Sequence, residues 1–528
     1  MSDTARNGPL LIAWWKDRLL IAAGVTFALW SVLSLTWPLS GDAGVFSWMA
    51  DTVYRGGAPY VDSWDTKGPS SWLPSLLMQL IVGRTAWGIR IFDIASVVAA
   101  VAAMRSISIA LALSGSGRIA ISLYLLWYAS LDFWTSAQPD GWVAAWLIMA
   151  VALALGRSRL GPAGAGILVG LAAMQKPFYV GYIVVVWMVV AISPGGIGRA
   201  VVTRSLLAAV GLLTAVGLQL LFLNASGGLN GYWDVQRWNI DVYAQLDTRW
   251  LTRIPSTVRG MFTLPWGVVT PMALFGVVQL ARRQPRATLA LGVGLAGAVL
   301  GVMLQGKGWL YHWLPMLPFL ALLADVGFGS LLAERADDPA RQLRRMTLII
   351  ALVVAALAPV QQLYRFVSSR GSRASVETYE RREFRYYGRY AGSAYAIVDS
   401  LARIEPRSAR ILLWAMHPAP QFLAGLPQPT RFAVLRPLYD GAGSAYRARY
   451  RAQFDSALRM RPPRWWLVPT KKQVNREPEL KEFEIEGFPA AHDYLKKHYR
   501  AVSQSEDWLI YERVATAAAR SEGTIPAH

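Results

Sequence analysis

Apolar runs of membrane-spanning length recur along the first 363 residues, and they constrain the fold more than any other feature of the sequence. The hydrocarbon core of a bilayer accommodates about 20 helical residues. Of all residues, 54% are hydrophobic and only 16% are charged, a balance too apolar for an ordinary soluble domain. The sequence therefore predicts a polytopic α-helical membrane protein.

The formal net charge of +20 is also explained by a membrane protein. Many arginines lie in short clusters between apolar runs, which is the pattern that orients membrane helices. We therefore expect no nucleic-acid partner.

The chain has no cysteine, which excludes disulfide bonds and thiol catalysis. The first apolar run follows Arg6, Lys16 and Arg18 without a clear small-residue cleavage site, so it is interpreted as a retained anchor with a cytoplasmic N-terminus.

The arginine clusters predict about eleven spans if the short segment Ser70 to Gly83 is an interfacial or re-entrant helix. If it were a full span, every later arginine cluster would lie outside. Residues 1–363 are then a transmembrane module with outer loops 40–90, 135–141 and 224–260. The predicted spans are Leu19–Leu39, Ile91–Leu113, Ile119–Trp134, Trp142–Leu155, Gly161–Met174, Phe178–Ile192, Leu206–Leu223, Met261–Leu280, Ala287–Leu304, Leu310–Leu332 and Met346–Leu363.

After residue 363 no apolar run is long enough to cross a membrane, and charged residues become frequent. Short apolar segments that alternate with helical patterns are typical of a small α/β layer domain. Residues 364–528 are therefore predicted to form an extracytoplasmic, periplasmic α/β domain. The expected helices are Val376–Ile404, Ala445–Met460 and Pro489–Tyr499, and the expected strands lie at 411–416, 431–435, 465–470, 501–504 and 508–513.

The first outer loop concentrates ionisable groups at a membrane face. Asp42 directly follows the first apolar run, and Lys67 lies in the segment DTKGP. Asp42 is interpreted either as a helix N-cap or as a functional carboxylate, because charged groups at membrane depth are costly. Lys67 is either a snorkelling anchor or a cation that neutralises a phosphate.

Similar groups occur at the other predicted outer ends. Asp140, in AQPDGW, is a helix cap or a second acid on the same face as Asp42, and the two could position an acceptor hydroxyl or share a divalent cation. Lys176 and Lys307 repeat the arrangement of a lone lysine beside a proline or glycine. Three such lysines on one face would suit a lipid phosphate.

Aromatic and basic residues flank these lysines. His312 is a core residue or part of the same opening as Lys307, and Tyr311 is a membrane-interface anchor or a sugar or lipid contact. The outer-loop arginines are weaker candidates for the same phosphate, with a solvated basic surface as the alternative; they are Arg237, Arg249 and Arg253.

The sequence contains no P-loop, no GxSxG elbow, no HExxH motif and no Cys/His metal cluster. Without a nucleotide cradle, and with the polar loops outside, a cytosolic sugar nucleotide is a poor substrate. A donor delivered within the bilayer fits better.

Four segments of the sequence resemble the motifs of a known superfamily: the loop ending in YVDSWDTKGP, then AQPD, GLAAMQKPF and GKGWLYHWLPMLP. In this order they resemble the GT-C superfamily of polyprenyl-phosphate-sugar-dependent glycosyltransferases, in particular the branch with the lipid A aminoarabinose transferase and the protein O-mannosyltransferases. The similarity covers about Leu19 to Leu323. It implies that Asp42 is the catalytic base or metal-proximal acid and that Asp140 is the acid of the second loop. Lys67 corresponds to the family's phosphate-binding lysine, although Gly68 precedes the proline here and Ala43 replaces a second acid.

The resemblance implies an inverting transfer of a sugar from a polyprenyl-phosphate carrier to an acceptor hydroxyl at a bacterial inner membrane. Lys67 would hold the donor phosphate with help from Lys176, Lys307, His312 or Tyr311. Magnesium or manganese at Asp42 and Asp140 is the expected cofactor if there is one. The acceptor could be a lipid, a glycan or a protein. The alternatives are a transporter of lipid-linked glycans and a non-enzymatic scaffold.

Overall fold

The computed structural model divides the chain into two compact units, each built from several stretches of sequence. The first comprises the residues up to Trp37, Arg90–Gln219 and Thr248–Val376, and the second comprises Pro38–Ile89, Leu220–Asp247 and the residues from Glu377 onward. Each unit is described by itself. The described residues are 17–514 apart from 114–116, 194–197, 247–249, 264, 333–339, 385–387, 407–408, 416–417 and 477.

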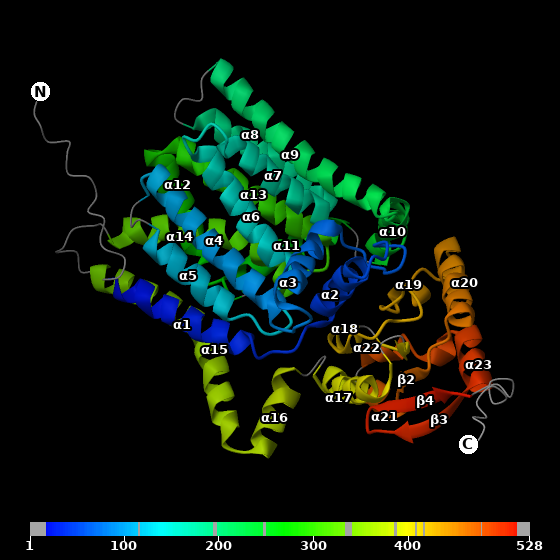
Figure 1. Cartoon of the computed structure of the whole chain (residues 1–528). Coiled ribbons are helices and arrows are strands. Elements are labelled where there is room, and N and C mark those ends of the chain that lie inside the picture. The colour runs from blue at the N-terminus through cyan, green and yellow to red at the C-terminus, as the bar shows by residue number, and fades with distance from the viewer. Residues whose placement is uncertain are drawn as a thin grey trace, which may run out of the picture. The chain divides into compact units, whose positions relative to one another are not determined.

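The first unit is helical, and its long helices run side by side as a bundle (Figure 1). Three of its helices, α4, α9 and α16, continue into the second unit. The elements are α1 (Arg18–Ser34), α4 (Gly88–Ala110), α5 (Arg118–Ala129), α6 (Pro139–Leu155), α7 (Gly161–Gln175), η3 (Pro177–Gly181), α8 (Tyr182–Ile192), α9 (Arg199–Ala225), α11 (Trp250–Thr263), α12 (Thr270–Arg283), α13 (Pro285–Gln305), η5 (Leu310–Met316), α14 (Leu317–Leu332), α15 (Ala340–Ser368), η6 (Ser369–Gly371) and α16 (Arg373–Glu383).

Among the described residues, five helical segments of 21 to 27 residues are long and apolar enough to cross a membrane. Further apolar helices of 10–17 residues accompany them, and α3 (Leu73–Val82) is one of these short helices. The interfacial or re-entrant placement of Ser70 to Gly83 stays a prediction, since α5 (Arg118–Ala129), which is predicted to be a full span, is also short. The total of about eleven spans stays a prediction. The five segments are Gly88–Ala110, Arg199–Ala225, Pro285–Gln305, Leu310–Leu332 and Arg345–Gly371.

Glycines set the closest helix packing in this bundle. A Cβ on Gly276 of α12 would lie 1.9 Å from the carbonyl oxygen of Leu323 in α14, and a Cβ on Gly327 would lie 2.2 Å from the carbonyl oxygen of Met272. The two backbones touch where neither helix has a side chain. Membrane helices associate through such small-residue contacts because lipid supplies no hydrophobic driving force between them.

The prediction of one continuous span from Met261 to Leu280 is wrong. Helix α11 ends at Thr263, and α12 begins only at Thr270. Pro265 and Pro271 explain the break, since proline cannot donate the helical hydrogen bond and clashes with the preceding turn. Hydropathy alone does not register this interruption.

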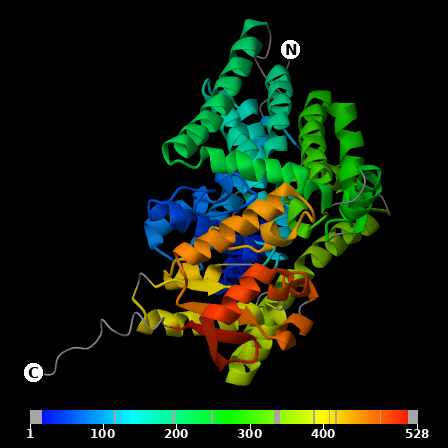
Figure 2. The same cartoon turned by 90° about the vertical axis from the view of Figure 1, so that its right-hand side faces the viewer.

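The second unit combines the first outer loop, the segment after α9 and the C-terminal residues. The C-terminal part, coloured yellow to red, is seen from a second side in Figure 2. Its elements are α2 (Gly41–Tyr54), η2 (Pro69–Ser71), α3, α10 (Leu229–Asp241), η4 (Tyr243–Leu246), α17 (Gly388–Ile404), β1 (Ile411–Leu413), α18 (Ala419–Ala424), α19 (Arg436–Tyr439), α20 (Ala445–Met460), β2 (Trp465–Pro469), α21 (Lys471–Arg476), α22 (Pro478–Lys481), η7 (Ile485–Gly487), α23 (Pro489–His498), β3 (Tyr499–Gln504) and β4 (Trp508–Arg513).

The described strands of this unit form one sheet in the order β1-β2-β4-β3. Strands β1 and β2 are parallel, with Ile411 opposite Trp465, whereas β2–β4 and β4–β3 are antiparallel. The sheet and α17 share a core that includes Val398, Leu467 and Trp508. The predicted α/β layering is confirmed in these residues.

Two expectations for the C-terminal part are wrong. Residues 431–435 form no strand; Phe432 instead packs against Tyr450 and Phe454 of α20, so its burial reflects packing on a helix. The helix expected over Val376–Ile404 is present as two, α16 and α17, and residues 385–387 between them lie outside the described ranges.

Candidate active site

Helix α2 presents Asp42 in its first turn. Ser40 is the N-cap, and its side chain accepts a hydrogen bond from the Ala43 backbone N–H at 3.3 Å, so Asp42 is not the cap. The Asp42 carboxylate is half-buried and has no hydrogen-bond or ion-pair partner among the described residues. Asp42 is therefore a carboxylate available to a ligand.

A second carboxyl, Asp65, lies near Asp42 in the same unit. Asp65 is only 7% exposed, and its Oδ2 has no hydrogen-bond partner among the described residues. Burial raises the pKa of Asp65 to about 6; Lys67 opposes this rise, the charge of Asp42 adds to it, and the backbone N–H groups of Thr66 and Lys67 oppose it. The sequence analysis did not single out Asp65, and its place two residues before Lys67 was the only available signal.

The loop that carries Lys67 is fixed by buried hydrogen bonds. Tyr60 Oη donates to the Lys67 carbonyl oxygen at 2.8 Å and accepts from Trp72 Nε1 at 3.0 Å. Gln236 of α10 donates from Nε2 to the Thr66 carbonyl oxygen at 3.1 Å. Lys67 Nζ, which is half-buried, donates to Thr66 Oγ1 at 3.3 Å. The second unit thus places Asp42, Asp65 and Lys67 in one neighbourhood.

In the first unit, Asp140 and Lys176 form a buried ion pair. Lys176 Nζ lies 2.7 Å from both Asp140 carboxylate oxygens and also donates to Gln305 Oε1. Asp140 is 1% exposed and Lys176 is 8% exposed. Helix α7 ends at Gln175 because Pro177 cannot continue it, and this leaves Lys176 at the helix terminus. Sequence reasoning named both residues but not their pairing.

Asp93 of α4 supports the turn before Asp140. Its carboxylate accepts hydrogen bonds from Tyr128 Oη at 2.6 Å, from Trp142 Nε1 at 3.1 Å and from the Ala137 backbone N–H at 3.1 Å. Ala137 has a φ of 54°, which L-residues rarely adopt. The carboxylate therefore holds a strained turn directly upstream of the Asp140 helix.

Lys307, Tyr311 and His312 belong to one aromatic cluster that includes Trp309. The Lys307 ammonium lies 5.5 Å from the centre of the Trp309 ring, and the His312 ring lies 5.4 Å from Trp309 and 4.6 Å from Tyr311. Tyr311 and His312 are buried, whereas Lys307 is half-buried. The predicted grouping of these residues is present within the first unit.

A cavity of about 210 Å³ lies beside the same segment. Arg253 and Arg259 of α11 line it with Gly306 and Gly308, and the rest of the lining is Ser256, Thr257, Gly260, Thr263, Val302 and Trp313. Gly306 has a φ of 72°, and a Cβ there would lie 2.8 Å from the Arg253 guanidinium carbon. The two guanidinium groups suit a phosphate, whereas the hydroxyls of Ser256 and Thr263 already donate to backbone carbonyl oxygens of α11. Of the other two arginines in the predicted group, Arg237 is exposed and Arg249 lies outside the described residues.

The predicted residues therefore divide between the two units. Asp42 and Lys67 belong to the second unit, and Asp140, Lys176, Lys307, Tyr311 and His312 belong to the first. A metal site at Asp42 and Asp140 fits the described residues poorly. Both Asp140 oxygens are engaged by Lys176, and in the described ranges no group of three or more His, Cys, Asp or Glu side chains could hold a metal ion.

This combination of apolar membrane-length helices and a small α/β part is a fold that solved structures of membrane proteins share. Two structures of ArnT from Cupriavidus metallidurans share it over nearly their whole length. The undecaprenyl phosphate complex aligns with 15% identity and a TM-score of 0.57, covering 94% of this chain and 98% of ArnT. The apo form aligns with 14% identity and a TM-score of 0.60, covering 94% and 97%.

A mycobacterial arabinofuranosyltransferase, AftD, aligns with 16% identity and a TM-score of 0.50, covering 94% of this chain and 41% of AftD. No protein-family model matches the sequence. No curated protein sequence matches it either. The structural likeness establishes the fold, and the chemistry must be argued from the side chains.

Proposed function

We propose that this chain is an integral-membrane glycosyltransferase of the bacterial inner membrane. It moves a sugar from a polyprenyl-phosphate carrier to an acceptor hydroxyl on the extracytoplasmic face. The observation that carries the proposal is the Asp42 carboxylate, which has no hydrogen-bond or ion-pair partner within the described part of the chain and, like Lys67, influences Asp65 electrostatically, on a fold shared with a protein bound to undecaprenyl phosphate. The N-terminus is cytoplasmic and residues 364–528 are periplasmic in this proposal.

Asp42 acts as the general base. Its carboxylate takes the proton of the acceptor hydroxyl, and the acceptor oxygen bonds to the anomeric carbon while the bond from that carbon to the phosphate oxygen breaks. The leaving lipid phosphate keeps the electron pair. A single displacement of this kind inverts the anomeric configuration. A positioned base typically contributes about 10²- to 10⁴-fold to the rate.

Cations that stabilise the leaving phosphate make the larger electrostatic contribution, because charge develops there in a low-dielectric environment. Within the second unit, Lys67 is a cation of this kind. Within the first unit, Arg253 and Arg259 line a cavity whose guanidinium groups suit a phosphate. Lys307, Tyr311 and His312 flank that cavity's glycine segment and contact the lipid-linked donor. The mechanism takes no step through a metal ion.

The Asp140–Lys176 pair has a different task from that of a free acid and a free amine. Three acceptor atoms already surround Lys176 Nζ, two from Asp140 and one from Gln305. A donor phosphate oxygen would take the place of Gln305 Oε1. Asp140 then orients the Lys176 ammonium rather than acting as a second base.

The deciding experiment supplies the purified chain in nanodiscs with a radiolabelled polyprenyl-phosphate sugar and an envelope-lipid extract. We expect label in a new product, together with release of polyprenyl phosphate. Mass spectrometry of the product identifies the acceptor class. Movement of intact donor across the bilayer without bond cleavage would instead identify a transporter.

A further inference from the structure

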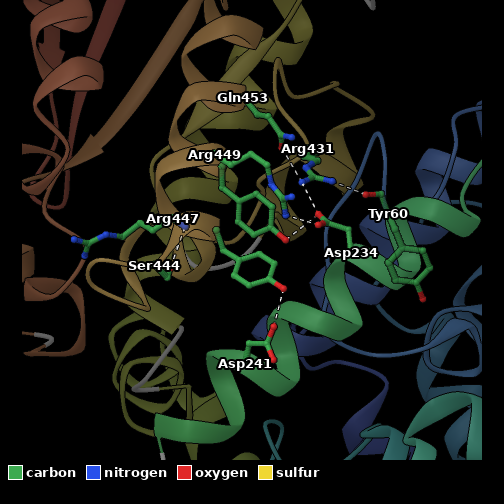
Figure 3. Close-up of polar contacts among 10 residues, drawn as sticks. Tyr60, Asp234, Asp241, Arg431, Ser444, Arg447, Arg449 and Gln453 are labelled. Atoms are coloured by element: carbon green, nitrogen blue, oxygen red, sulfur yellow. Dashed lines mark hydrogen bonds and ion pairs between the residues drawn. The ribbon is translucent and has the colours of Figure 1, made fainter.

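One arginine of the C-terminal part contacts the loop that carries Lys67. Arg431 Nη1 donates to the Tyr60 carbonyl oxygen at 2.9 Å, as drawn in Figure 3. Its Nη2 donates to Gln453 Oε1 at 2.8 Å and lies 3.6 Å from Asp234 Oδ2. All these residues belong to the second unit. Segments more than 370 residues apart in the sequence are thus joined at one guanidinium group.

The Arg431 guanidinium is held rigidly. Its side chain is 13% exposed, and its Cζ lies 4.9 Å from the Phe432 ring centre and 5.0 Å from that of Tyr450. Asp234 of α10 also accepts from Arg449 and, at 3.0 Å, from Tyr450 Oη. Stacking and paired charges leave this planar group little freedom to turn.

Tyr60 passes this constraint on to Lys67. Its side chain is fully buried, its carbonyl oxygen accepts from Arg431, and its Oη donates to the Lys67 carbonyl oxygen. Tyr60 has a φ of 65°, a left-handed conformation that is unfavourable for a bulky L-residue. Such a conformation persists only where the surroundings hold it in place. Arg431 is one of the groups that do so.

We infer that Arg431 is a positioning residue for Lys67, acting through the Tyr60 backbone, so that the C-terminal α/β part sets the geometry of the donor-phosphate ligand. The inference rests on the phosphate role proposed above for Lys67. The C-terminal part also contacts the helix of Asp42: a Cβ on Gly44 would lie 2.9 Å from Ala419 Cβ in α18. It therefore supports both polar elements of the first loop.

The test compares Arg431→Met with Arg449→Met in the full chain in nanodiscs. Arg449 is the matched control, because it also binds Asp234 but is not joined to Tyr60 by any described hydrogen bond. We expect Arg431→Met to weaken binding of undecaprenyl phosphate about tenfold, the size of a lost charge-assisted hydrogen bond. Arg449→Met should leave binding within about twofold. Arg431→Lys, which can still donate one bond to Tyr60, should recover part of the affinity.

Two further arms separate this inference from the proposed function. In a Lys67→Met background, Arg431→Met should have no additional effect on binding, and an undiminished effect would overturn the path through Lys67. Amide hydrogen exchange over residues 60–67 should accelerate in Arg431→Met but not in Arg449→Met, whether or not the protein binds lipid. Unchanged exchange refutes the positioning role. Faster exchange in a chain that never binds undecaprenyl phosphate refutes the phosphate site instead.

Discussion

Lys176 Nζ lies 2.7 Å from each carboxylate oxygen of Asp140, and the two side chains are almost completely buried. Removing one partner leaves an uncompensated buried charge. Lys176→Met should therefore destabilise the protein by about 3–5 kcal/mol. Joint replacement, Lys176→Met with Asp140→Leu, should recover most of this stability without restoring transfer. Thermal unfolding in detergent measures the first effect, and sugar transfer measures the second.

The exposed pair of Arg403 and Asp399 serves as the control for this comparison. Its side chains are 77% and 61% exposed. Arg403→Met should cost less than about 1 kcal/mol, because solvent screens such a pair. Equal losses of stability in Lys176→Met and Arg403→Met would mean that Asp140 and Lys176 are hydrated rather than buried.

Asp42→Asn should abolish sugar transfer, with kcat lowered about 10²- to 10⁴-fold. The amide is isosteric but cannot accept the acceptor's proton at neutral pH. Ser40 rather than Asp42 caps the helix, so thermal stability and undecaprenyl phosphate binding should stay near wild-type. Asp399→Asn, on an exposed helix face, is the matched control. Retained turnover in Asp42→Asn would remove Asp42 from the role of base.

The cavity lined by Arg253 and Arg259 is expected to bind the donor phosphate. Replacing both by methionine should raise KM for the donor about 10²- to 10⁴-fold with a smaller change in kcat, since each of the two charge-assisted bonds contributes roughly 1.5–3 kcal/mol. Gly306→Ala, which displaces the Arg253 guanidinium alone, should raise KM about 10- to 100-fold. Arg282→Met, in the last turn of α12, tests for nonspecific loss of positive charge. A KM that does not move in the double variant would place the phosphate elsewhere.

Asp65 should make stability depend on pH. Its pKa is raised to about 6 by burial, so the folded protein holds the proton more tightly than the unfolded chain. The stability that the protonated Asp65 carboxyl contributes to the folded protein is fully present below about pH 4. This stability is lost as the pH rises through 6. The loss is on the order of 2–3 kcal/mol for a shift of this size.

Asp65→Asn stays neutral at every pH and should gain stability relative to wild-type between pH 4 and pH 7. Lys67 and Asp42 are the charged groups that influence this carboxyl, and both are unchanged in the variant. Unfolding curves followed by tryptophan fluorescence, with 23 tryptophans in the chain, provide the measurement. Parallel pH profiles for the two proteins would show that Asp65 is not buried in the folded state.

The predicted topology can be tested by chemical labelling, because the chain has no cysteine of its own. Single cysteines at the exposed positions Val61, Arg283 and Lys497 report on the first loop, the end of α12 and α23. A membrane-impermeant thiol reagent applied to intact spheroplasts should label the first and third but not the second. If both Val61→Cys and Arg283→Cys were labelled, the first loop and the end of α12 would lie on the same side of the membrane. This result would contradict the topology on which the catalytic proposal depends.

The fold class follows from local sequence properties. Hydropathy over about twenty residues predicted the long apolar helices, and alternating patterns predicted β2, β3 and β4, because both signals lie within contiguous residues. The signal failed at Met261–Leu280, where prolines interrupt an apolar run, and at residues 431–435, where Phe432 packs on a helix. In both cases the segment is apolar, as the prediction requires, but its backbone does not adopt the predicted helix or strand.

The sequence by itself determined which residues could carry chemistry: Asp42 beside an apolar run, lysines beside prolines and glycines, and a histidine among aromatics. Only the tertiary structure decided what each one touches. It gave Asp42 no hydrogen-bond or ion-pair partner among the residues described, paired Lys176 with Asp140 across 36 residues, and joined Arg431 to Tyr60 across 371. The physical reason is that polarity is a property of one side chain, whereas desolvation and charge pairing depend on neighbours that the chain reaches only by folding.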